Sequence, residues 1–144
     1  MTIAGILKHK GHHVTTVEPA MTIAEVVQVL TSKRIGAVLV LDTGGQLLGV
    51  LSERDIVCKL AEHGARTLEM TAAQLMTTEV TTASPQTTVD QAMGMMTDGR
   101  FRHIPVVEGG HLAGLVSIGD VVKAKITDAE QEVDSLRAYV AGAA

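Results

Sequence analysis

The sequence predicts an α/β (α+β) fold made of two copies of one βαββα unit, followed by an extended C-terminal helix. An internal repeat is the first sign of this fold: residues 14–42 align with 80–108, and after a one-residue gap residues 44–57 align with 109–122. Within each copy, apolar residues switch between helical and strand-like spacing in the same order. Because one unit of roughly 45 residues is too small to fold well alone, we expect the two units to share one core.

Each copy is expected to begin with a short Val-Thr-Thr strand, at residues 14–16 and 80–82, that leads to a proline. A helix then starts at Thr22 or Thr88, since threonine is a good N-cap residue. In the first copy Glu25, three residues further on, is expected to complete a capping box. Apolar residues at helical spacing support both helices: Ile23, Val26, Val27 and Leu30, and Val89, Ala92, Met93 and Met96.

A β-hairpin and a second helix follow in each copy. The hairpin strands are predicted at residues 37–41 and 47–51 and at residues 104–107 and 112–116, joined by glycine-containing turns. The second helices are expected to begin near Ser52 and Ser117, and the first of them to end at His63-Gly64.

Further helices are predicted outside the two copies, at residues 2–9 and, as a single turn, at residues 71–76. The last helix continues well past the second copy and carries an apolar stripe that steps by four and three residues: Val122, Ile126, Ala129, Val133, Leu136 and Val140. The predicted organisation is a leading helix and linker (1–11), repeat 1 (12–65), a connection (66–79), repeat 2 (80–125) and a C-terminal helical extension (126–144).

Composition and charge exclude several classes of protein. The chain is 46% hydrophobic and 19% charged, which argues against disorder. An aromatic content of 1% excludes a binding face of stacked rings, and a net charge of −4 disfavours general nucleic-acid binding. One cysteine, Cys58, allows no internal disulfide, no apolar run can span a membrane and no secretory signal is evident. We therefore expect a cytoplasmic protein without a membrane or nucleic-acid partner.

Catalytic and metal-binding motifs are not evident in the sequence. It contains neither a phosphate-binding P-loop nor a nucleophile–base–orienter set, so we expect no enzyme and no catalytic cofactor. His9, His12 and His13 lack an accompanying cysteine or carboxylate, so no metal site is predicted. Cys58 lies in an amphipathic helix without a basic cluster and is expected to be packed rather than nucleophilic.

Three sequence elements carry a resemblance to a known family. Residues 49–55 (Gly-Val-Leu-Ser-Glu-Arg-Asp) and 114–120 (Gly-Leu-Val-Ser-Ile-Gly-Asp) share a Gly-x-x-Ser-x-x-Asp pattern, and residues 101–107 read Phe-Arg-His-Ile-Pro-Val-Val. Over roughly residues 12–125 the chain resembles a tandem cystathionine β-synthase (CBS) domain pair, or Bateman module, of the stand-alone bacterial type.

The resemblance implies two βαββα domains packed with pseudo-two-fold symmetry, with two related ligand clefts. Such modules most often bind AMP, ADP, ATP or NAD(H), sometimes S-adenosylmethionine, and commonly form homodimers. Small stand-alone members usually regulate a separate protein. The resemblance therefore implies a non-catalytic adenine-nucleotide sensor, with AMP the favoured ligand, ATP or NAD(H) as open alternatives, and an unknown regulated protein.

The Ser-x-x-Asp element suits a nucleotide because it lies where a strand gives way to a helix, whose N-terminal N–H groups attract phosphate. An aspartate there can accept two hydrogen bonds from a ribose diol, and a serine hydroxyl can donate to a ribose or phosphate oxygen. By family likeness, Ser52 and Asp55 belong to one cleft, and Ser117 and Asp120 to the other. Serine and aspartate also cap helices without any ligand, which leaves a purely structural role open.

Basic residues are expected to make the two clefts unequal. Arg100, Arg102 and His103 form a cluster suited to a phosphate, so we expect the second copy to hold a nucleotide more tightly. In the first copy Arg54 can reach a phosphate or form a surface salt bridge. Apolar walls and threonines complete the predicted sites: Ala37, Val38 and Leu51 in copy one, His103, Ile104 and Val116 in copy two, and Thr16 and Thr82 at matching positions.

Two alternatives to the sensor remain open on the sequence. The first is a ligand-independent module with degenerate clefts that only dimerises or acts as a scaffold. The second is a nucleic-acid-binding regulator, which the net charge of −4 disfavours. Nucleotide binding distinguishes the sensor from the scaffold.

Overall fold

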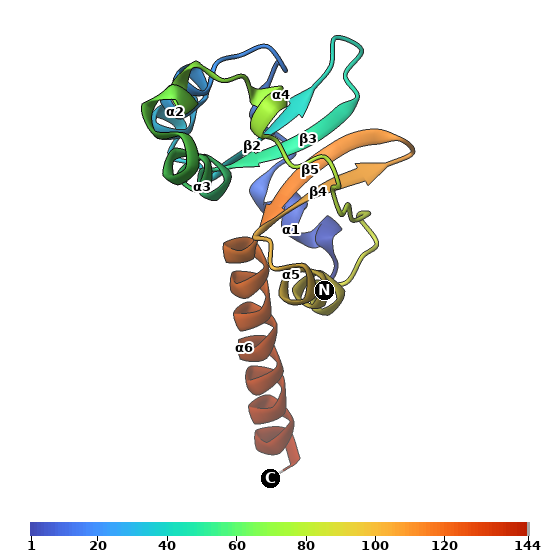
Figure 1. Ribbon diagram of the computed structural model, residues 1–144. Helices are drawn as coiled ribbons and strands as arrows, with labels where there is room; N and C mark the ends of the chain where they lie inside the picture. Colours follow the sequence, from blue (N-terminus) through green and yellow to red (C-terminus); the bar gives the residue numbers. More distant parts are fainter. Residues whose placement is uncertain (144) are drawn as a thin grey trace. The chain divides into compact units, whose positions relative to one another are not determined.

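The computed structural model describes residues 1–143, which fold as two compact units (Figure 1). We call them by the aspartate that each one carries. The Asp55 unit consists of His13–Thr81 and Gly109–Leu112, and the Asp120 unit of Met1–His12, Thr82–Glu108 and residues 113–143. Within residues 1–143, no helix is both long enough and apolar enough to cross a membrane.

The Asp55 unit contains a three-stranded sheet in the order β1-β2-β3. β1 (Thr16–Val17) runs parallel to β2 (Ala37–Leu41), which pairs with β3 (Leu47–Ser52) in an antiparallel hairpin. The other elements of this unit are helical: α2 (Ile23–Lys33), α3 (Glu53–His63), η1 (Gly64–Glu69) and α4 (Ala72–Leu75).

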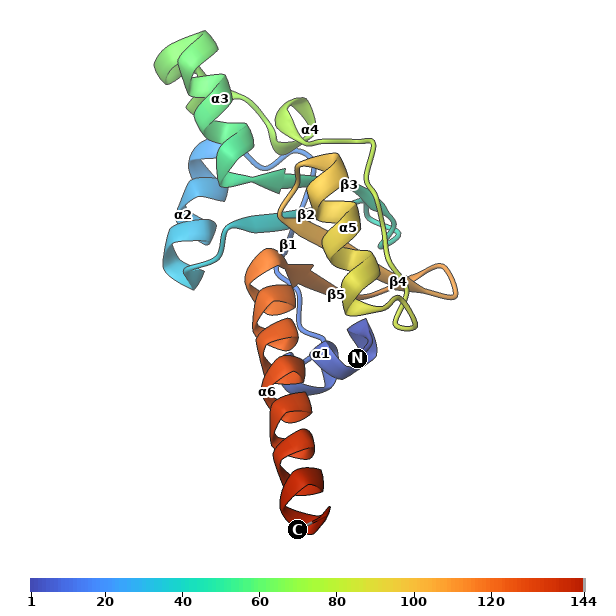
Figure 2. The same cartoon turned by 90° about the horizontal axis from the view of Figure 1, so that it is seen from below.

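The Asp120 unit is built around β4 (His103–Glu108) and residues 113–117 of β5 (His111–Ser117), which pairs with β4. Its helices are α1 (Ile3–Lys10), α5 (Val89–Gly99) and α6 (Ile118–Ala143). α1 and α5 lie beside the first turns of α6 (Figures 1 and 2). The strand expected at residues 80–82 does not form; its place is taken by a single parallel bridge, one residue further on, between Ala83 and Val106.

Each unit has its own aliphatic core, so the expectation of one shared core is wrong. In the Asp55 unit the fully buried side chains include Ile23, Val26, Val38, Val40 and Leu51. In the Asp120 unit they include Ile3, Ala92, Ile104, Val106, Val116 and Val121. A unit of this size can bury a core because it recruits an additional helix, described next.

α1 and α4 are equivalent elements of the duplication, although the sequence repeat does not reveal it. α4 follows repeat 1 and packs in the Asp55 unit, whereas α1 precedes repeat 1 and packs in the Asp120 unit with repeat 2. Matching backbone hydrogen bonds define the equivalence: Ile23 N–H to Met70 O and Ala72 N–H to Met21 O in one unit, Val89 N–H to Met1 O and Ile3 N–H to Thr87 O in the other. The leading helix therefore completes the core of the second repeat.

The helix N-caps follow the prediction at Thr22 and Thr88, whose hydroxyl oxygens accept from the N–H groups of Glu25 and Gln91. The capping box predicted for Glu25 is wrong, because its carboxylate instead accepts the Thr22 hydroxyl at 2.9 Å. The second copy does hold a capping box, since Thr88 N–H donates to Gln91 Oε1 at 2.9 Å.

The expectation that Cys58 is packed is also wrong, because its side chain is exposed. On α3 the buried position is Ile56, which is 4% exposed. Two residues further along a helix the side chain points about 200° away, so Cys58 faces solvent.

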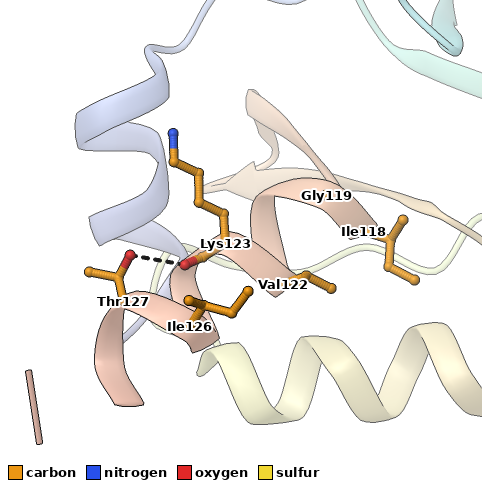
Figure 3. A pocket seen from close by; sticks show the side chains of 6 residues that line it. All are labelled: Ile118, Gly119, Val122, Lys123, Ile126 and Thr127. Carbon is orange, nitrogen blue, oxygen red and sulfur yellow. Dashed lines mark hydrogen bonds between the residues drawn. The ribbon is translucent and has the colours of Figure 1, made fainter. Parts of the chain in front are cut away.

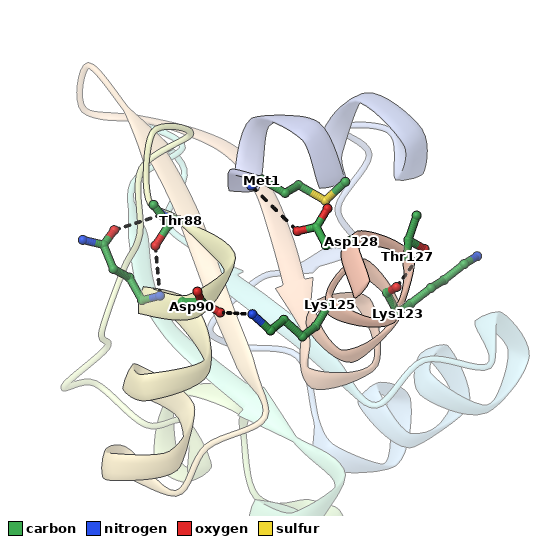
Figure 4. A network of polar contacts seen from close by, with 8 residues as sticks. Met1, Thr88, Asp90, Lys123, Lys125, Thr127 and Asp128 are labelled. Carbon is green, nitrogen blue, oxygen red and sulfur yellow. Dashed lines mark hydrogen bonds and ion pairs between the residues drawn. The ribbon is translucent and has the colours of Figure 1, made fainter. Parts of the chain in front are cut away.

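Hydrophobic contacts and ion pairs fasten the first turns of α6 to the rest of the Asp120 unit. Val121 and Ala124 are buried in its core. Three ion pairs join α6 to other parts of this unit: the Met1 ammonium, which precedes α1, to Asp128 (3.8 Å), Lys10 of α1 to Asp120 (2.6 Å), and Asp90 of α5 to Lys125 (2.8 Å). Figure 4 shows the first and third of these pairs. The hydrogen bond from Lys125 holds the pKa of Asp90 below its usual range.

Candidate ligand-binding site

Each unit presents a Ser-x-x-Asp pair at the point where the hairpin ends and a helix begins. In the Asp55 unit Ser52 N–H and Ser52 Oγ–H both donate to Asp55 Oδ2, at 2.9 and 3.0 Å. Asp55 N–H donates back to Ser52 Oγ at 3.2 Å, which makes this pair the capping box of α3. Both side chains are half-buried. The pair therefore caps α3 and stands at the positive end of that helix.

The Asp120 unit repeats this arrangement and adds a cation. Ser117 N–H donates to Asp120 Oδ2 at 2.9 Å, and Asp120 N–H donates to Ser117 Oγ at 3.2 Å. Lys10 Nζ, from α1, donates to the same Oδ2 at 2.6 Å and to Leu115 O at 2.8 Å. Lys10 thus links the end of α1 to the end of β5 and the start of α6.

Two opposing effects act on the pKa of Asp120. Partial burial raises it, but the hydrogen bond from Lys10, the hydrogen bond from the Ser117 backbone and the charge of Lys10 together outweigh burial. The pKa of Asp120 is therefore below its ordinary value, and the group is a carboxylate at neutral pH.

The hairpins bring several of the other predicted residues close to these pairs. In the Asp55 unit Ala37 pairs with Ser52, and Val38 pairs with Leu51, on adjacent strands. In the Asp120 unit Ile118 N–H donates to Arg102 O at 2.8 Å, which places the start of β4 against the start of α6. The two groups of predicted residues lie in different units: Thr16, Ala37, Val38, Leu51, Ser52, Arg54 and Asp55 in one, and Thr82, Arg100, Arg102, His103, Ile104, Val116, Ser117 and Asp120 in the other.

The predicted residues differ in how accessible they are. Thr16, Arg54, Thr82, Arg100 and Arg102 are exposed, and His103 is half-buried. Five predicted wall residues are instead core side chains with 3% exposure or less: Ala37, Val38, Leu51, Ile104 and Val116. Direct contact between these five side chains and an adenine ring stays a prediction, and the predicted residues that are exposed or half-buried are all polar.

Arg34 and Arg100 share an unusual backbone conformation. They have φ angles of 54° and 56° and follow α2 and α5 at equivalent positions of the repeat. After α2, Ile35 N–H returns to Leu30 O at 3.1 Å and Arg34 N–H to Thr31 O at 3.3 Å, the pattern of a Schellman motif. Glycine usually fills such a position, so an arginine there carries backbone strain.

The contact of Lys10 with Asp120 is not predictable from the sequence pattern. The repeat starts after Lys10, and no motif connects α1 to Asp120, which lies 110 residues further on. His12, from the same segment, makes a second link, with Nδ1 2.9 Å from Ala113 O. Within residues 1–143 no cluster of three or more His, Cys, Asp or Glu side chains could hold a metal ion.

A shallow apolar hollow lies along α6 and begins at Ile118 and Gly119, the two residues between Ser117 and Asp120. It is lined by Ile118, Gly119, Val122, Lys123, Ile126 and Thr127 (Figure 3). Ile118, Val122 and Ile126 contribute the apolar surface, and none of the predicted site residues lines it.

Comparison with a family model and with curated proteins agrees with the fold described above. The model of the CBS domain matches residues 10–62 and 72–127. The CBS domain-containing protein CBSX3, mitochondrial, of Arabidopsis thaliana is 36% identical over 152 residues, which cover 98% of this chain and 72% of that protein.

Solved structures show the same architecture. The CBS-domain containing protein ATU1752 from Agrobacterium tumefaciens is 45% identical, with a TM-score of 0.85 over 87% of this chain and 99% of that chain. The CBS domain pair of protein MJ0100, in complex with 5′-methylthioadenosine and S-adenosyl-L-methionine, has a TM-score of 0.78 over 89% of this chain and 98% of that chain. Its sequence identity is 23%, so this second likeness concerns the fold alone.

Proposed function

Since this chain belongs to the CBS-domain family and carries two copies of the domain, we propose that it is a non-catalytic regulatory sensor that binds an adenine nucleotide. The observation that carries the proposal is the same Ser-x-x-Asp pair at the same strand-to-helix junction in both units. The MJ0100 pair binds two adenosine-containing molecules, which supports an adenosine-type ligand for this fold. AMP is the favoured ligand, with ATP and NAD(H) as further candidates.

The charges around Asp120 favour a phosphorylated ligand in that unit. Arg100 and Arg102 are exposed in the same unit, and the Arg102 backbone lies at the start of α6. Lys10 and Ser117 donate to Oδ2 of Asp120, so Oδ1 can accept from a ribose hydroxyl. Guanidinium groups bind phosphate through paired N–H donors. We therefore expect the Asp120 unit to bind AMP more tightly than the Asp55 unit.

A scaffold without a ligand is the second candidate, and one observation favours it. In each unit the serine and the aspartate already hydrogen-bond to each other as a helix cap. In the Asp120 unit, Lys10 also neutralises the charge of Asp120. The motif thus has a structural use without any nucleotide. In this case the clefts are degenerate and the module only assembles with other proteins.

Two further parts of the proposal concern assembly and location. We expect the sensor to act as a homodimer in the cytoplasm and to change what a regulated protein contacts when its ligand binds. A nucleotide can shift such an equilibrium only if it binds one state more tightly than the other. Nucleic acid and membranes are not expected as partners.

A thermal-shift panel tests the proposal on the full chain. AMP, ADP, ATP, NADH and S-adenosylmethionine are compared with GMP and CMP at equal millimolar concentrations. A ligand at about 100 times its Kd stabilises the folded state by about 2.7 kcal/mol, which raises the Tm by several degrees. We expect this rise from adenine compounds only. The absence of any shift with all five would favour the scaffold.

The phosphate assignment has its own test. Arg102→Ala is expected to weaken AMP binding at least several-fold while changing adenosine binding little, because only AMP has a phosphate to lose. Arg66→Ala, an exposed arginine of η1 that belongs to neither predicted site, is the matched control. Equal losses for AMP and adenosine on Arg102→Ala would contradict the assignment.

A further inference from the structure

The outer face of α6 carries an exposed apolar stripe. Five of its large side chains are between 43% and 64% exposed: Val122, Ile126, Val133, Leu136 and Val140. Ala129, which is also exposed, completes the stripe. The core of the unit takes the opposite face of the helix, through Val121 and Ala124, so the stripe is left uncovered. At its start the stripe merges with the apolar hollow of Figure 3.

The spacing of the stripe is that of a two-stranded coiled coil. Its residues step by four and three along one continuous helix, which spans residues 118–143 and is about 39 Å long. Ile126, Val133 and Val140 take the heptad a positions, and all three are β-branched. Val122, Ala129 and Leu136 take the d positions. In a parallel coiled coil, β-branched residues at a combined with leucine at d favour two strands, and Leu136 is the leucine among these d positions.

The charges beside the stripe distinguish a parallel from an antiparallel pair. In a parallel, in-register pair, each g position faces the e position five residues later in the partner. Lys125 then faces the partner's Glu130, and Glu132 faces the partner's Arg137, so both contacts join opposite charges. Lys125 already forms an ion pair with Asp90 in its own chain. The pair of Glu132 with the partner's Arg137 therefore contributes more to the stability of the dimer.

The antiparallel alternative brings like charges together. When two stripes overlap fully in opposite directions, e positions face e positions and g positions face g positions. Glu130 then meets the partner's Glu130, Glu132 meets the partner's Glu132, and Lys123 meets the partner's Arg137. All three contacts are repulsive, so the surface charges select the parallel orientation.

We propose that α6 is a pairing surface on which two copies of this chain form a parallel, in-register coiled coil from Val122 to Val140. The inference deepens the homodimer of the proposed function and does not depend on a bound nucleotide. It assigns the partner, the surface and the orientation. The C-terminal ends of the two α6 helices then lie next to each other.

Disulfide trapping in the full chain tests the orientation. Cys58 is first replaced by serine, so that its exposed thiol cannot contribute a cross-link. In this background Val140→Cys is expected to give a disulfide-linked dimer in a glutathione buffer, since a positions face each other in a parallel pair. Ala138→Cys, at an outward f position, is the matched control and is expected to remain unlinked.

Mixing the Val122→Cys and Val140→Cys chains tests the opposite orientation. Residues 122 and 140 of two chains meet only in the antiparallel pair, because 18 residues of helix separate them by about 27 Å in the parallel one. Cross-linking of the mixed pair, without cross-linking of Val140→Cys alone, would overturn the proposal. So would a dimer that links none of these variants.

Charge reversal tests the register through the dimer Kd, measured by analytical ultracentrifugation. Glu132→Arg and Arg137→Glu are each expected to raise the Kd about tenfold, because each replaces two symmetric attractions by repulsions. The double variant is expected to restore it. Unchanged Kd values, or a monomer at micromolar concentration, would contradict the proposal. The thermal-shift panel of nucleotides is measured on the same protein. A loss of α6 pairing can therefore be distinguished from a loss of nucleotide binding.

Discussion

Arg34 and Arg100 show how a single position can combine strain with function. Both arginines hold a left-handed backbone conformation that costs a non-glycine residue about 1–2 kcal/mol. Nothing in the sequence pattern marks them, because Lys33-Arg34 and Gly99-Arg100 do not look like helix ends that need a positive φ. Only Arg100 belongs to the proposed phosphate cluster, so the two positions form a natural matched pair.

Glycine at either position is expected to stabilise the protein. Arg34→Gly and Arg100→Gly should each raise the free energy of unfolding by about 0.5–1 kcal/mol, after allowing for the greater freedom of glycine in the unfolded chain. Urea unfolding measures this effect. Arg100→Gly should also weaken AMP binding, whereas Arg34→Gly should leave it unchanged. A loss of stability in both variants would show that the arginine side chains hold the turns.

Lys10 and Asp120 make stability depend on pH. The pKa of Asp120 is lowered in the folded state, so its contribution is present at neutral pH and is lost as pH falls below about 4 and through the folded pKa. Lys10→Met is expected to cost roughly 0.5–1 kcal/mol at pH 7, since the pair is partly exposed, and the difference from wild type should shrink at acid pH.

Carbon-13 NMR of the Asp120 carboxyl group is the direct measurement of this link. In Lys10→Met the pKa of Asp120 should rise, because burial remains while the cation is gone. Lys8→Met, on the exposed side of the same helix, is the control and should leave the pKa unchanged. An unchanged titration in Lys10→Met would contradict the ion pair.

Among the helices and strands, the sequence predicts least well that α1 packs with repeat 2 while α4 packs with repeat 1. Hairpins, helix caps and the long last helix follow from local spacing, and their predicted limits lie close to those observed. The match between residues 1–7 and 70–76 consists of little more than Met-Thr followed by alanine two positions later, which is too short to extend a repeat. Only the backbone hydrogen bonds to the start of α2 and α5 reveal it.

The glycine of each Gly-x-x-Ser-x-x-Asp motif packs closely against α1 or against the residues that follow α4. A Cβ added to Gly114 would lie 2.7 Å from Leu7 Cδ2 of α1, and one added to Gly49 would lie 2.7 Å from the backbone oxygen of Thr77. Leu7 is 1% exposed and cannot move freely. The motif glycines therefore serve packing in both units, in addition to any role near a ligand.

Substitution of these glycines is expected to destabilise the two units to different extents. Gly114→Ala should cost about 1–3 kcal/mol through overpacking. Gly49→Ala should cost more, because backbone cannot rotate away as a side chain can. In a double-mutant cycle, Gly114→Ala and Leu7→Ala together should cost less than the sum of the single changes. Strict additivity in urea unfolding would contradict the packing of α1 against β5.

For the whole molecule, the sequence predicted the family and the two matched pairs of serine and aspartate. It could do so because the Gly-x-x-Ser-x-x-Asp motif occurs twice, at equivalent positions of the internal repeat. It did not predict that five of the expected apolar walls are core side chains, since a strand residue next to a motif reads the same whether it faces a ligand or the core. Nor did it predict Lys10, because a contact across 110 residues leaves no local pattern.

Calorimetric titration of AMP tests most directly whether the Ser-x-x-Asp pairs bind the nucleotide. The wild-type chain is compared with Asp55→Ala, Asp120→Ala and the double variant, and Asp98→Ala, an exposed aspartate of α5, is the control. Circular dichroism verifies that each variant is folded. We expect Asp120→Ala to weaken binding several-fold more than Asp55→Ala, and the double variant to give no binding heat. A double variant that binds AMP as tightly as wild type would show that the Ser-x-x-Asp pairs do not bind the nucleotide.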